Sequence, residues 1–306
     1  MNPLKIAARD YISLRRSLGF KIKGDPGKLA SFVSFMNDRG ASHITTRLAL
    51  QWAQENPDTK PSTASGRLSC LRGFATYLSA KDPRTQIPHL GLLPYHSKRA
   101  KPYLYSEAEV QCLLKAALDM GGIHGFTYYC LLGLLSVTGM RISEVFNLRP
   151  QDVDLQQGIL SIVRTKFAKS RLVPVHPTTQ AMLVKYARHR DRHFRRQLSY
   201  FFVNKLGSRL ASGNVHTIYR RLSYQVGLRT ARTGRGPRLH DFRHNFAVRT
   251  LVAWYRSGKN IEEQFPTLTT YLGHTNVSDT YWYLSNHPEL MGIAIKRFEQ
   301  HWEEAV

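Results

Sequence analysis

The stretch 158-GILSIVRTKFAKSRLVPVH-176 interrupts a chain whose other patterns are helical. Its two ends, ILSIV and RLVPV, are rich in β-branched residues, and a short basic turn joins them. Two such segments around a polar turn are typical of a β-hairpin. The predicted fold class is therefore mainly α with a small β-hairpin or sheet, which makes the hairpin part of an α+β domain.

Helix-period patterns flank the hairpin on both sides. Residues 2 to about 80 form a series of short amphipathic segments, at 29–40, 47–56 and 63–80. After the hairpin, apolar residues at helical spacing predict helices at 177–195, 212–226, 239–256, 266–272, 276–285 and 288–305. Before it, Ser106 with Glu109 three residues later is a capping-box signature that predicts a helix at 105–118.

Four prolines lie in the segment 82-DPRTQIPHLGLLPYHSKRAKP-102, where the helical patterns stop. Proline-rich, basic segments between periodic regions are typical of linkers. The sequence therefore predicts an N-terminal helical bundle at 1–83, a linker at 84–103 and a second domain at 104–306.

The chain carries 44 Lys and Arg against 21 Asp and Glu, a net charge of +23. Such an excess favours a polyanionic partner, most often nucleic acid. A basic protein of the ribosomal type is the alternative, but those are usually shorter and poorer in aromatic residues. Composition therefore favours a nucleic-acid-binding protein.

Other classes of protein find little support in the sequence. The longest apolar run, 128-YYCLLGLLSV-137, is far shorter than the roughly 20 residues that a membrane helix needs. The N-terminus lacks the charged-then-apolar pattern of a signal peptide. Cys70, Cys112 and Cys130 are scattered, without CxxC spacing. We therefore expect buried thiols in a reducing cytoplasm, no disulfide frame, no zinc site and no membrane partner.

The stretch 138-TGMRISEVFNL-148 places an arginine at a predicted helix start. Gly139 supplies a tight turn, and Arg141 precedes the apolar face of the helix. A helix N-terminus favours anions, so an arginine there is explained if both bind a phosphate. The alternatives are a plain surface arginine and, for Glu144, a first-turn acid that supports the helix or orients Arg141.

In 240-HDFRHNFAV-248, His240, Arg243 and His244 lie three and four residues apart. They share one helix face, where they could act on one group. The i, i+4 histidines also match a zinc-protease helix, with Asp241 in place of its glutamate. A zinc site needs a third ligand, and the sequence offers no clear motif for one.

The stretch 273-GHTNVSDTYWYL-284 contains two tyrosines. On a helix over 276–285, Val277, Tyr281 and Leu284 form an apolar stripe that should face the core. Residues two apart do not share a face, so Tyr283 should lie on the polar side. This spacing predicts that Tyr281 packs and that Tyr283 has a free hydroxyl.

TGMR-ISEV, the basic β-turn, HDFRH, and LGH followed nine residues later by tyrosine occur together in this order. In these motifs the chain resembles the tyrosine recombinases, the phage integrase, Xer and transposon-borne DNA strand-transfer enzymes. The resemblance covers the second domain, and the N-terminal helices fit the family's SAM-like core-DNA-binding domain. It implies a C-shaped clamp on DNA formed by a catalytic domain and that helical domain.

The resemblance also implies roles for particular residues. Arg141 and Arg243 match the arginines that hold the scissile phosphate, His240 and His274 the assisting histidines, and Tyr283 the nucleophile. Lys166 aligns with the lysine general acid, with Lys169 as the alternative, because the turn reads T-K-F where many relatives have glycines.

The reaction that the resemblance implies joins DNA strands through a 3′-phosphotyrosyl intermediate, with no ATP, metal or other cofactor. The implied setting is a mobile genetic element, where the enzyme serves integration, excision or transposition. The alternatives are an inactive or accessory DNA-binding protein on the same scaffold, and an enzyme of the type IB topoisomerase kind.

Double-stranded DNA is the expected partner, together with other copies of the chain in a tetramer on paired sites or with related recombinase subunits. The expected location is the cytoplasm, at the nucleoid. Cationic runs in the hairpin turn, at 185–196 and at 220–238, predict phosphate contacts from Arg164, Lys169, Arg171, Arg192, Arg195, Arg196, Arg220, Arg221 and Arg235.

Overall fold

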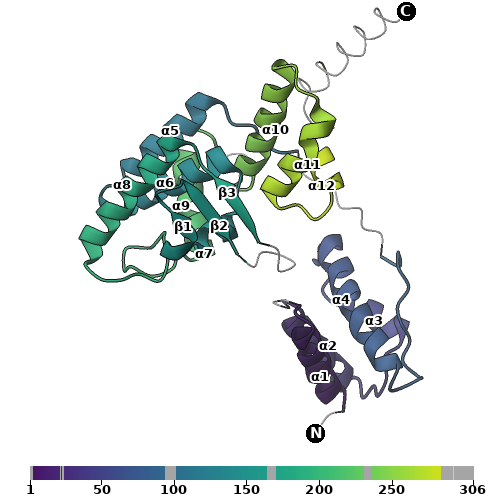
Figure 1. Ribbon diagram of the computed structural model, residues 1–306. Helices are drawn as coiled ribbons and strands as arrows, with labels where there is room; N and C mark the ends of the chain where they lie inside the picture. The colour runs from purple at the N-terminus through teal and green to yellow at the C-terminus, as the bar shows by residue number, and fades with distance from the viewer. Residues whose placement is uncertain are drawn as a thin grey trace, which may run out of the picture. The chain divides into compact units, whose positions relative to one another are not determined.

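The chain folds into two compact units, residues 1–100 and 101–306 (Figure 1). This computed structural model describes residues 3–20, 22, 24–93, 101–163, 170–230, 236–283 and 292. Each unit has a hydrophobic core of its own. The boundary between the units falls inside the segment 84–103 for which the sequence predicts a linker.

In its described residues, the first unit is a bundle of four helices, α1 (Pro3–Ser17), α2 (Asp25–Asp38), α3 (Thr46–Ala53) and α4 (Pro61–Ser79). Both α2 and α4 have proline in the first turn, where its missing N–H costs nothing. Trp52 and Phe32 are fully buried and meet edge to face at 5.1 Å. Arg72 of α4 donates to the carbonyls of Pro88 and His89, so the first part of the predicted linker is held against this bundle.

The main core of the second unit is built from helices and a small sheet. The helices are α5 (Glu107–Leu118), α6 (Gly122–Thr138), α7 (Ile142–Asn147), α8 (Pro177–Phe194) and α9 (Ser212–Gln225). The capping box at Ser106 and Glu109 is confirmed by both of its hydrogen bonds. The apolar α6 is surrounded by other elements, which explains why it is apolar on nearly every side.

The sheet has three antiparallel strands in the order β1-β2-β3, with bounds Val153–Asp154, Ile159–Ile162 and Arg171–Pro174. The predicted hairpin is confirmed, because β2 pairs with β3 from Ile159–Pro174 to Ile162–Arg171. Strand β1, which follows the 3-10 turn Pro150–Asp152, was not predicted. The tip of the hairpin, 164–169, lies outside the described residues.

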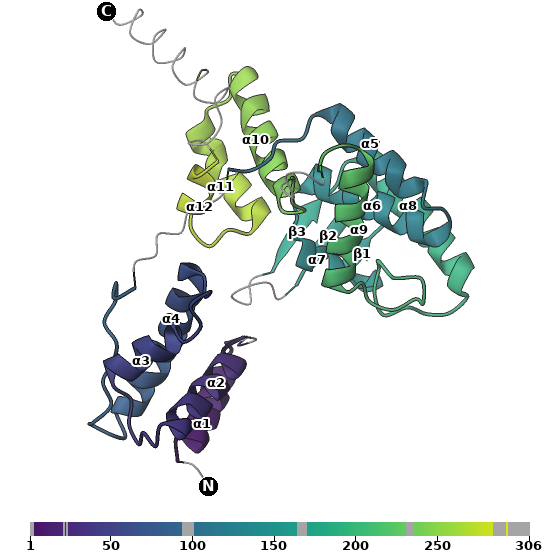
Figure 2. The ribbon, with the colours of Figure 1, turned by 180° about the vertical axis from the view of Figure 1, so that it is seen from behind.

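The last described elements, α10 (Asp241–Arg256), α11 (Ile261–Leu272) and α12 (Ser278–Tyr281), form a group around a smaller core (Figure 2). Helix α11 begins earlier than predicted, because Asn260 caps it and Pro266 is accommodated inside it. Helix α12 is only four residues long, far shorter than the predicted 276–285. The predicted terminal helix 288–305 lies outside the described residues, apart from residue 292.

No helix in the described part of the chain is long and apolar enough to span a membrane. The three cysteines are free thiols, with Cys130 buried, Cys70 half-buried and Cys112 exposed. The prediction that all three are buried is therefore wrong for Cys112, which lies on the outer side of α5.

Candidate active site

The start of α7 holds Arg141 in a fixed place. Gly139 ends α6 with φ of 59°, and a Cβ there would lie 2.6 Å from the Phe246 ring, so only glycine fits. Arg141 is the N-cap of α7, and Glu144 accepts from its amide at 2.9 Å and from its Nη1 at 3.1 Å. Glu144 therefore both caps the helix and orients the arginine, as one of the sequence interpretations held.

Arg243 lies in the first turn of α10 and is only 2% exposed. Its Nη1 donates to the Gly139 carbonyl at 3.0 Å and its Nη2 to the Leu272 carbonyl at 2.8 Å. Burial lowers the pKa of its guanidinium to about 10. Arg243 therefore remains charged at neutral pH and is held by main-chain atoms of two distant segments.

The C-terminus of α11 gathers both arginines. Gly273 ends this helix with φ of 69°. The Leu272 carbonyl, which accepts from Arg243, also accepts from Arg141 at 3.4 Å, and the Gly273 carbonyl accepts from Arg141 Nη2 at 2.8 Å. The carbonyls at a helix C-terminus carry partial negative charge, so this end of α11 stabilises cations.

Arg171, predicted to contact DNA from the hairpin, lies in the interior instead. Its side chain is 8% exposed and forms a bidentate pair with Glu144 at 3.0 and 2.8 Å, while its Nε donates to the Tyr271 carbonyl at 2.7 Å. The prediction is corrected because the guanidinium is bound by these groups inside the protein. Two arginines therefore bind one carboxylate, and Arg243 is linked to them through the Leu272 carbonyl that it shares with Arg141.

Glu144 is the counter-charge of this cluster. Burial acts to raise the pKa of its carboxyl group, but hydrogen bonds and charge from Arg171 and Arg141 outweigh it, so the pKa lies below the usual value. Glu144 is thus ionised at neutral pH. Three guanidinium groups with one carboxylate leave an excess of two positive charges, which suits the binding of an anion.

The two tyrosines lie opposite to the helix-face prediction. Tyr281 is 51% exposed, although it stacks on Phe265 at 4.4 Å, whereas Tyr283 is 3% exposed. The prediction assumed a helix through residue 285, but α12 ends at Tyr281 and Tyr283 follows in a turn. Because the helical period stops there, Tyr283 turns inward, and its hydroxyl is not free on a polar surface.

Tyr283 points into the arginine cluster. Its hydroxyl lies close enough to Arg243 and Arg141 for their charges to act on it, and its ring lies 6.0 Å from that of His274 and 5.4 Å from that of His244. Burial raises the pKa of the hydroxyl, while the positive charges of Arg243 and Arg141 act in the opposite direction. The structure thus brings Tyr283 together with the residues that the motifs predicted for one site.

A chain of hydroxyl groups determines which ring nitrogen of His274 carries the proton. Thr269 donates its hydroxyl to the Phe265 carbonyl at 2.8 Å, so it can only accept from Thr280, 3.0 Å away. The Thr280 oxygen then accepts from Nδ1 of His274 at 2.7 Å. Burial and the nearby arginines lower the pKa of His274 to about 4, so the neutral ring has its lone pair on Nε2.

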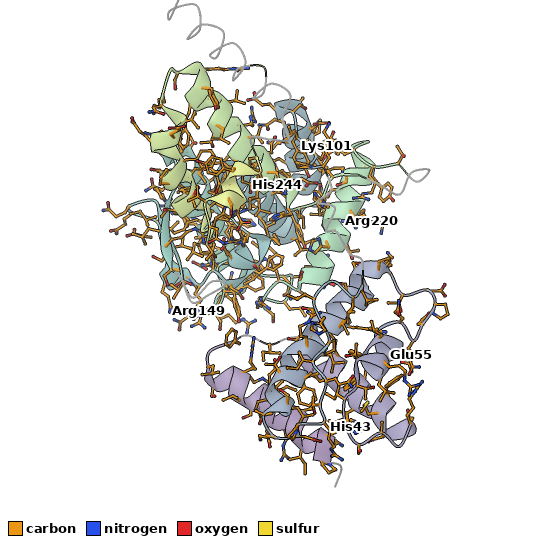
Figure 3. The ribbon with its side chains drawn as sticks, turned by 90° about the vertical axis from the view of Figure 1, so that its right-hand side faces the viewer. His43, Glu55, Lys101, Arg149, Arg220 and His244 are labelled. Atoms are coloured by element: carbon orange, nitrogen blue, oxygen red, sulfur yellow. The ribbon has the colours of Figure 1, made fainter. Side chains whose placement is uncertain are left out.

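His240 and His244 lie at the start of α10, with their rings 4.8 Å apart (His244 is labelled in Figure 3). Desolvation lowers the pKa of both, to about 4 for His244, and the neighbouring charge of Arg243 adds to the shift for His240. Nδ1 of His244 is buried and has no hydrogen-bond partner among the described residues. Within the same residues, no three His, Cys, Asp or Glu side chains are placed to hold a metal ion.

The remaining predicted residues fall into two groups. Exposed arginines lie at the end of α8 and on α9, where Arg195 is the C-cap of α8 and Arg196 donates to the Leu206 carbonyl at 2.8 Å; the exposed group is Arg192, Arg195, Arg196, Arg220 and Arg221. The second group lies outside the described residues and comprises Arg164, Lys166, Lys169 and Arg235.

Comparisons with known proteins agree with the family that the order of the motifs predicted. Residues 104–289 match the Phage integrase family. A Sinorhizobium fredii protein named as an integrase/recombinase, y4rB, is 47% identical over 99% of both chains. The tyrosine recombinase XerC of Chlamydia caviae is 30% identical over 76% of this chain and 70% of its own.

Among solved structures, the Tn1549 transposon integrase in complex with transposon right-end DNA has the same fold. Its TM-score is 0.67 at 15% identity, over 96% of this chain and 98% of that one. The chain belongs to the phage integrase family, and the predicted resemblance to the tyrosine recombinases is confirmed. It is an enzyme of the site-specific recombinase type.

Proposed function

We propose that the chain cuts and rejoins DNA strands through a covalent 3′-phosphotyrosyl intermediate, with Tyr283 as the nucleophile. The observation that carries this proposal is the Leu272 carbonyl that Arg243 shares with Arg141, beside a buried Tyr283 hydroxyl on which the charges of both arginines act. A phosphodiester bound by the two arginines would lie beside the tyrosine hydroxyl, as in-line attack requires.

In the proposed step, the Tyr283 oxygen forms a bond to phosphorus while the bond from phosphorus to the 5′ oxygen breaks. Arg141 and Arg243 neutralise charge that develops on the non-bridging oxygens. The departing 5′ oxygen takes a proton from Lys166, with Lys169 as the alternative. The phosphotyrosyl bond keeps the ester, so religation uses neither ATP nor metal.

The histidines supply the remaining proton chemistry. A neutral imidazole offers one N–H and one lone pair, and the lone pair of His274 is on Nε2 because Nδ1 donates to Thr280. We assign His274 to uptake of the phenol proton through Nε2, and His240 to hydrogen bonding with the phosphate or to the same proton uptake. Their lowered pKa values favour the neutral form in which they can accept it.

The partner in this proposal is double-stranded DNA, bound by the second unit and by residues 1–83 as a core-DNA-binding domain. A tetramer on paired sites would exchange strands for a mobile genetic element, in the cytoplasm. Support comes from the net charge of +23 and from the DNA that the Tn1549 integrase binds in its complex. The topoisomerase alternative predicts relaxation of supercoils without joining of two sites.

The test is covalent capture on nicked duplexes that tile the DNA on either side of the gene. Tyr283→Phe should bind these duplexes like the unmodified protein but form no covalent adduct, whereas Tyr281→Phe should form it. An adduct from Tyr283→Phe but none from Tyr281→Phe would assign the nucleophile to Tyr281. A two-site joining assay then separates recombination from relaxation.

A further inference from the structure

The side chain of Arg171 lies on the buried face of its hairpin, with Ile162 opposite it and Val173 two residues later. Ile162 and Val173 are 4% and 0% exposed, and the Arg171 side chain is 8% exposed. Burial of a guanidinium is costly unless its hydrogen bonds and charge are matched. The position therefore needs an explanation beyond an electrostatic contact with DNA.

Arg171 joins three elements through one rigid group. From β3 it binds both oxygens of Glu144 on α7 and, through Nε, the Tyr271 carbonyl in the last turn of α11. A lysine could not make all three bonds at once, because its single ammonium group lacks the planar, widely spaced N–H donors of a guanidinium. The turn-proximal end of the two strands is thus fixed to the two segments that carry and hold Arg141.

The charge of Arg171 also determines how much of Arg141 is available to a ligand. Each oxygen of Glu144 is shared, Oε1 between Arg141 Nη1 and Arg171 Nη1, and Oε2 between the Arg141 amide and Arg171 Nη2. Without Arg171, Arg141 would be the sole counter-charge of a buried carboxylate.

The turn after α11 is shaped around the same side chain. A Cβ on Gly273 would lie 2.8 Å from Nη1 of Arg171, and the Gly273 carbonyl accepts from Arg141 at 2.8 Å. The chain therefore passes Arg171 as closely as glycine allows while it presents an acceptor to Arg141. Displacement of Arg171 would move that acceptor.

From these contacts we propose that Arg171 is a positioning residue for strand transfer, which fixes the lysine-bearing hairpin to the phosphate-binding arginines without touching DNA. The inference rests on the proposed function, since it concerns the same site. It predicts that loss of Arg171 slows the covalent step at saturating DNA and leaves the electrostatic part of DNA binding unchanged.

The experiment compares Arg171→Lys, Arg171→Met, Glu144→Gln and the double variant Arg171→Met/Glu144→Gln. Two quantities are measured: the rate of adduct formation on saturating nicked duplex from the gene flanks, and the salt dependence of binding to a random 30-bp duplex. Arg171→Lys and Arg171→Met should lower the rate by about 10- to 100-fold. The salt slope should not change, whereas loss of a phosphate contact would reduce it by about one.

The double variant keeps the test valid if Arg171→Met does not fold, because it leaves no unpaired carboxylate. Its rate loss should be smaller than the product of the two single losses. Arg190→Lys is the matched control, because Arg190 is a buried arginine bound to Asp191 and the Phe201 carbonyl, both at 2.8 Å, and to none of the site residues. It should lower stability without slowing adduct formation.

A reduced salt slope with an unchanged rate would make Arg171 a DNA contact and overturn the inference. Independent effects of Arg171 and Glu144 would overturn it as well. These outcomes differ from failure of the proposed function, which would show as no adduct from the unsubstituted protein on any duplex of the set.

Discussion

Arginines in the second unit occupy two contrasting environments. Those of the site are held at fixed positions by backbone carbonyls and one carboxylate, and Arg243 is 2% exposed. Those on α8 and α9, such as Arg192 and Arg220, are exposed to solvent (Arg220 is labelled in Figure 3). The net charge of +23 therefore contains two populations, one that fixes the geometry of a reaction and one that attracts a polyanion.

The largest expected difference between the two populations comes from substitutions that keep the charge. Arg243→Lys should reduce adduct formation by about 100-fold or more, because lysine cannot reach two carbonyls and Tyr283 together. Arg192→Lys, the surface counterpart, should change the rate little. Single-turnover capture on nicked duplex measures both, and equal losses would show that the contrast has no functional meaning.

Substitution of a glycine in the turns beside the interior arginines should have the next largest effect. Gly273→Ala should lower the free energy of unfolding by about 1–3 kcal/mol, because it combines a left-handed backbone with a clash against Arg171. Gly258→Ala is the control, since Gly258 has φ of 72° but open space around its Cα. Urea titration should show a smaller loss for Gly258→Ala, and adduct formation should fall only in the Gly273 variant.

The interior charge should also make stability depend on pH. Burial and the surrounding charged groups lower the pKa of His244 and His274 to about 4, so the unfolded chain binds these protons first as pH falls. Stability is then full above pH 6.5 and declines between 6.5 and about 4, by at most about 1.4 kcal/mol per pH unit for each histidine. Thermal melting of His244→Gln should show a shallower decline; an unchanged pH dependence would contradict the assignment.

The smallest effect is expected from neutralising one surface arginine. Arg220→Gln and Arg192→Gln should each weaken binding to random duplex and reduce the salt slope by about one if the residue meets a phosphate. At saturating DNA, the rate of adduct formation should stay as it was. A slower covalent step would show that the residue acts in the reaction, as the interior arginines of the site are proposed to do.

Several parts of this structure were predictable from local patterns. The hairpin and the α5 capping box have short-range signals, in β-branched segments and in Ser106 with Glu109. The motif order identified the family. The sequence also placed Arg141 at a helix start, because Gly139 before it and apolar residues after it define the turn.

Other parts depend on contacts between distant segments. The predicted orientation of Tyr283 was wrong because α12 ends two residues before it. No local sequence pattern shows where so short a helix ends. The burial of Arg171 depends on Glu144, 27 residues earlier, and on Tyr271, 100 residues later. In the sequence, Glu144 was the one signal for the burial of Arg171, because a carboxylate beside a single arginine can bind a second cation.

The acceptors at the end of α11 are main-chain oxygens, so no single substitution can delete them. A random-mutagenesis screen for loss of strand transfer should therefore find few inactive variants among the Leu272 substitutions that keep the size of the side chain. Inactive variants should instead be frequent at Gly139 and Gly273, where the backbone conformation and the close neighbours require glycine. The positions of this site that are most sensitive to substitution are thus its two glycines. A variant library aimed at new DNA sequences can vary the exposed positions of α9 while those two are kept.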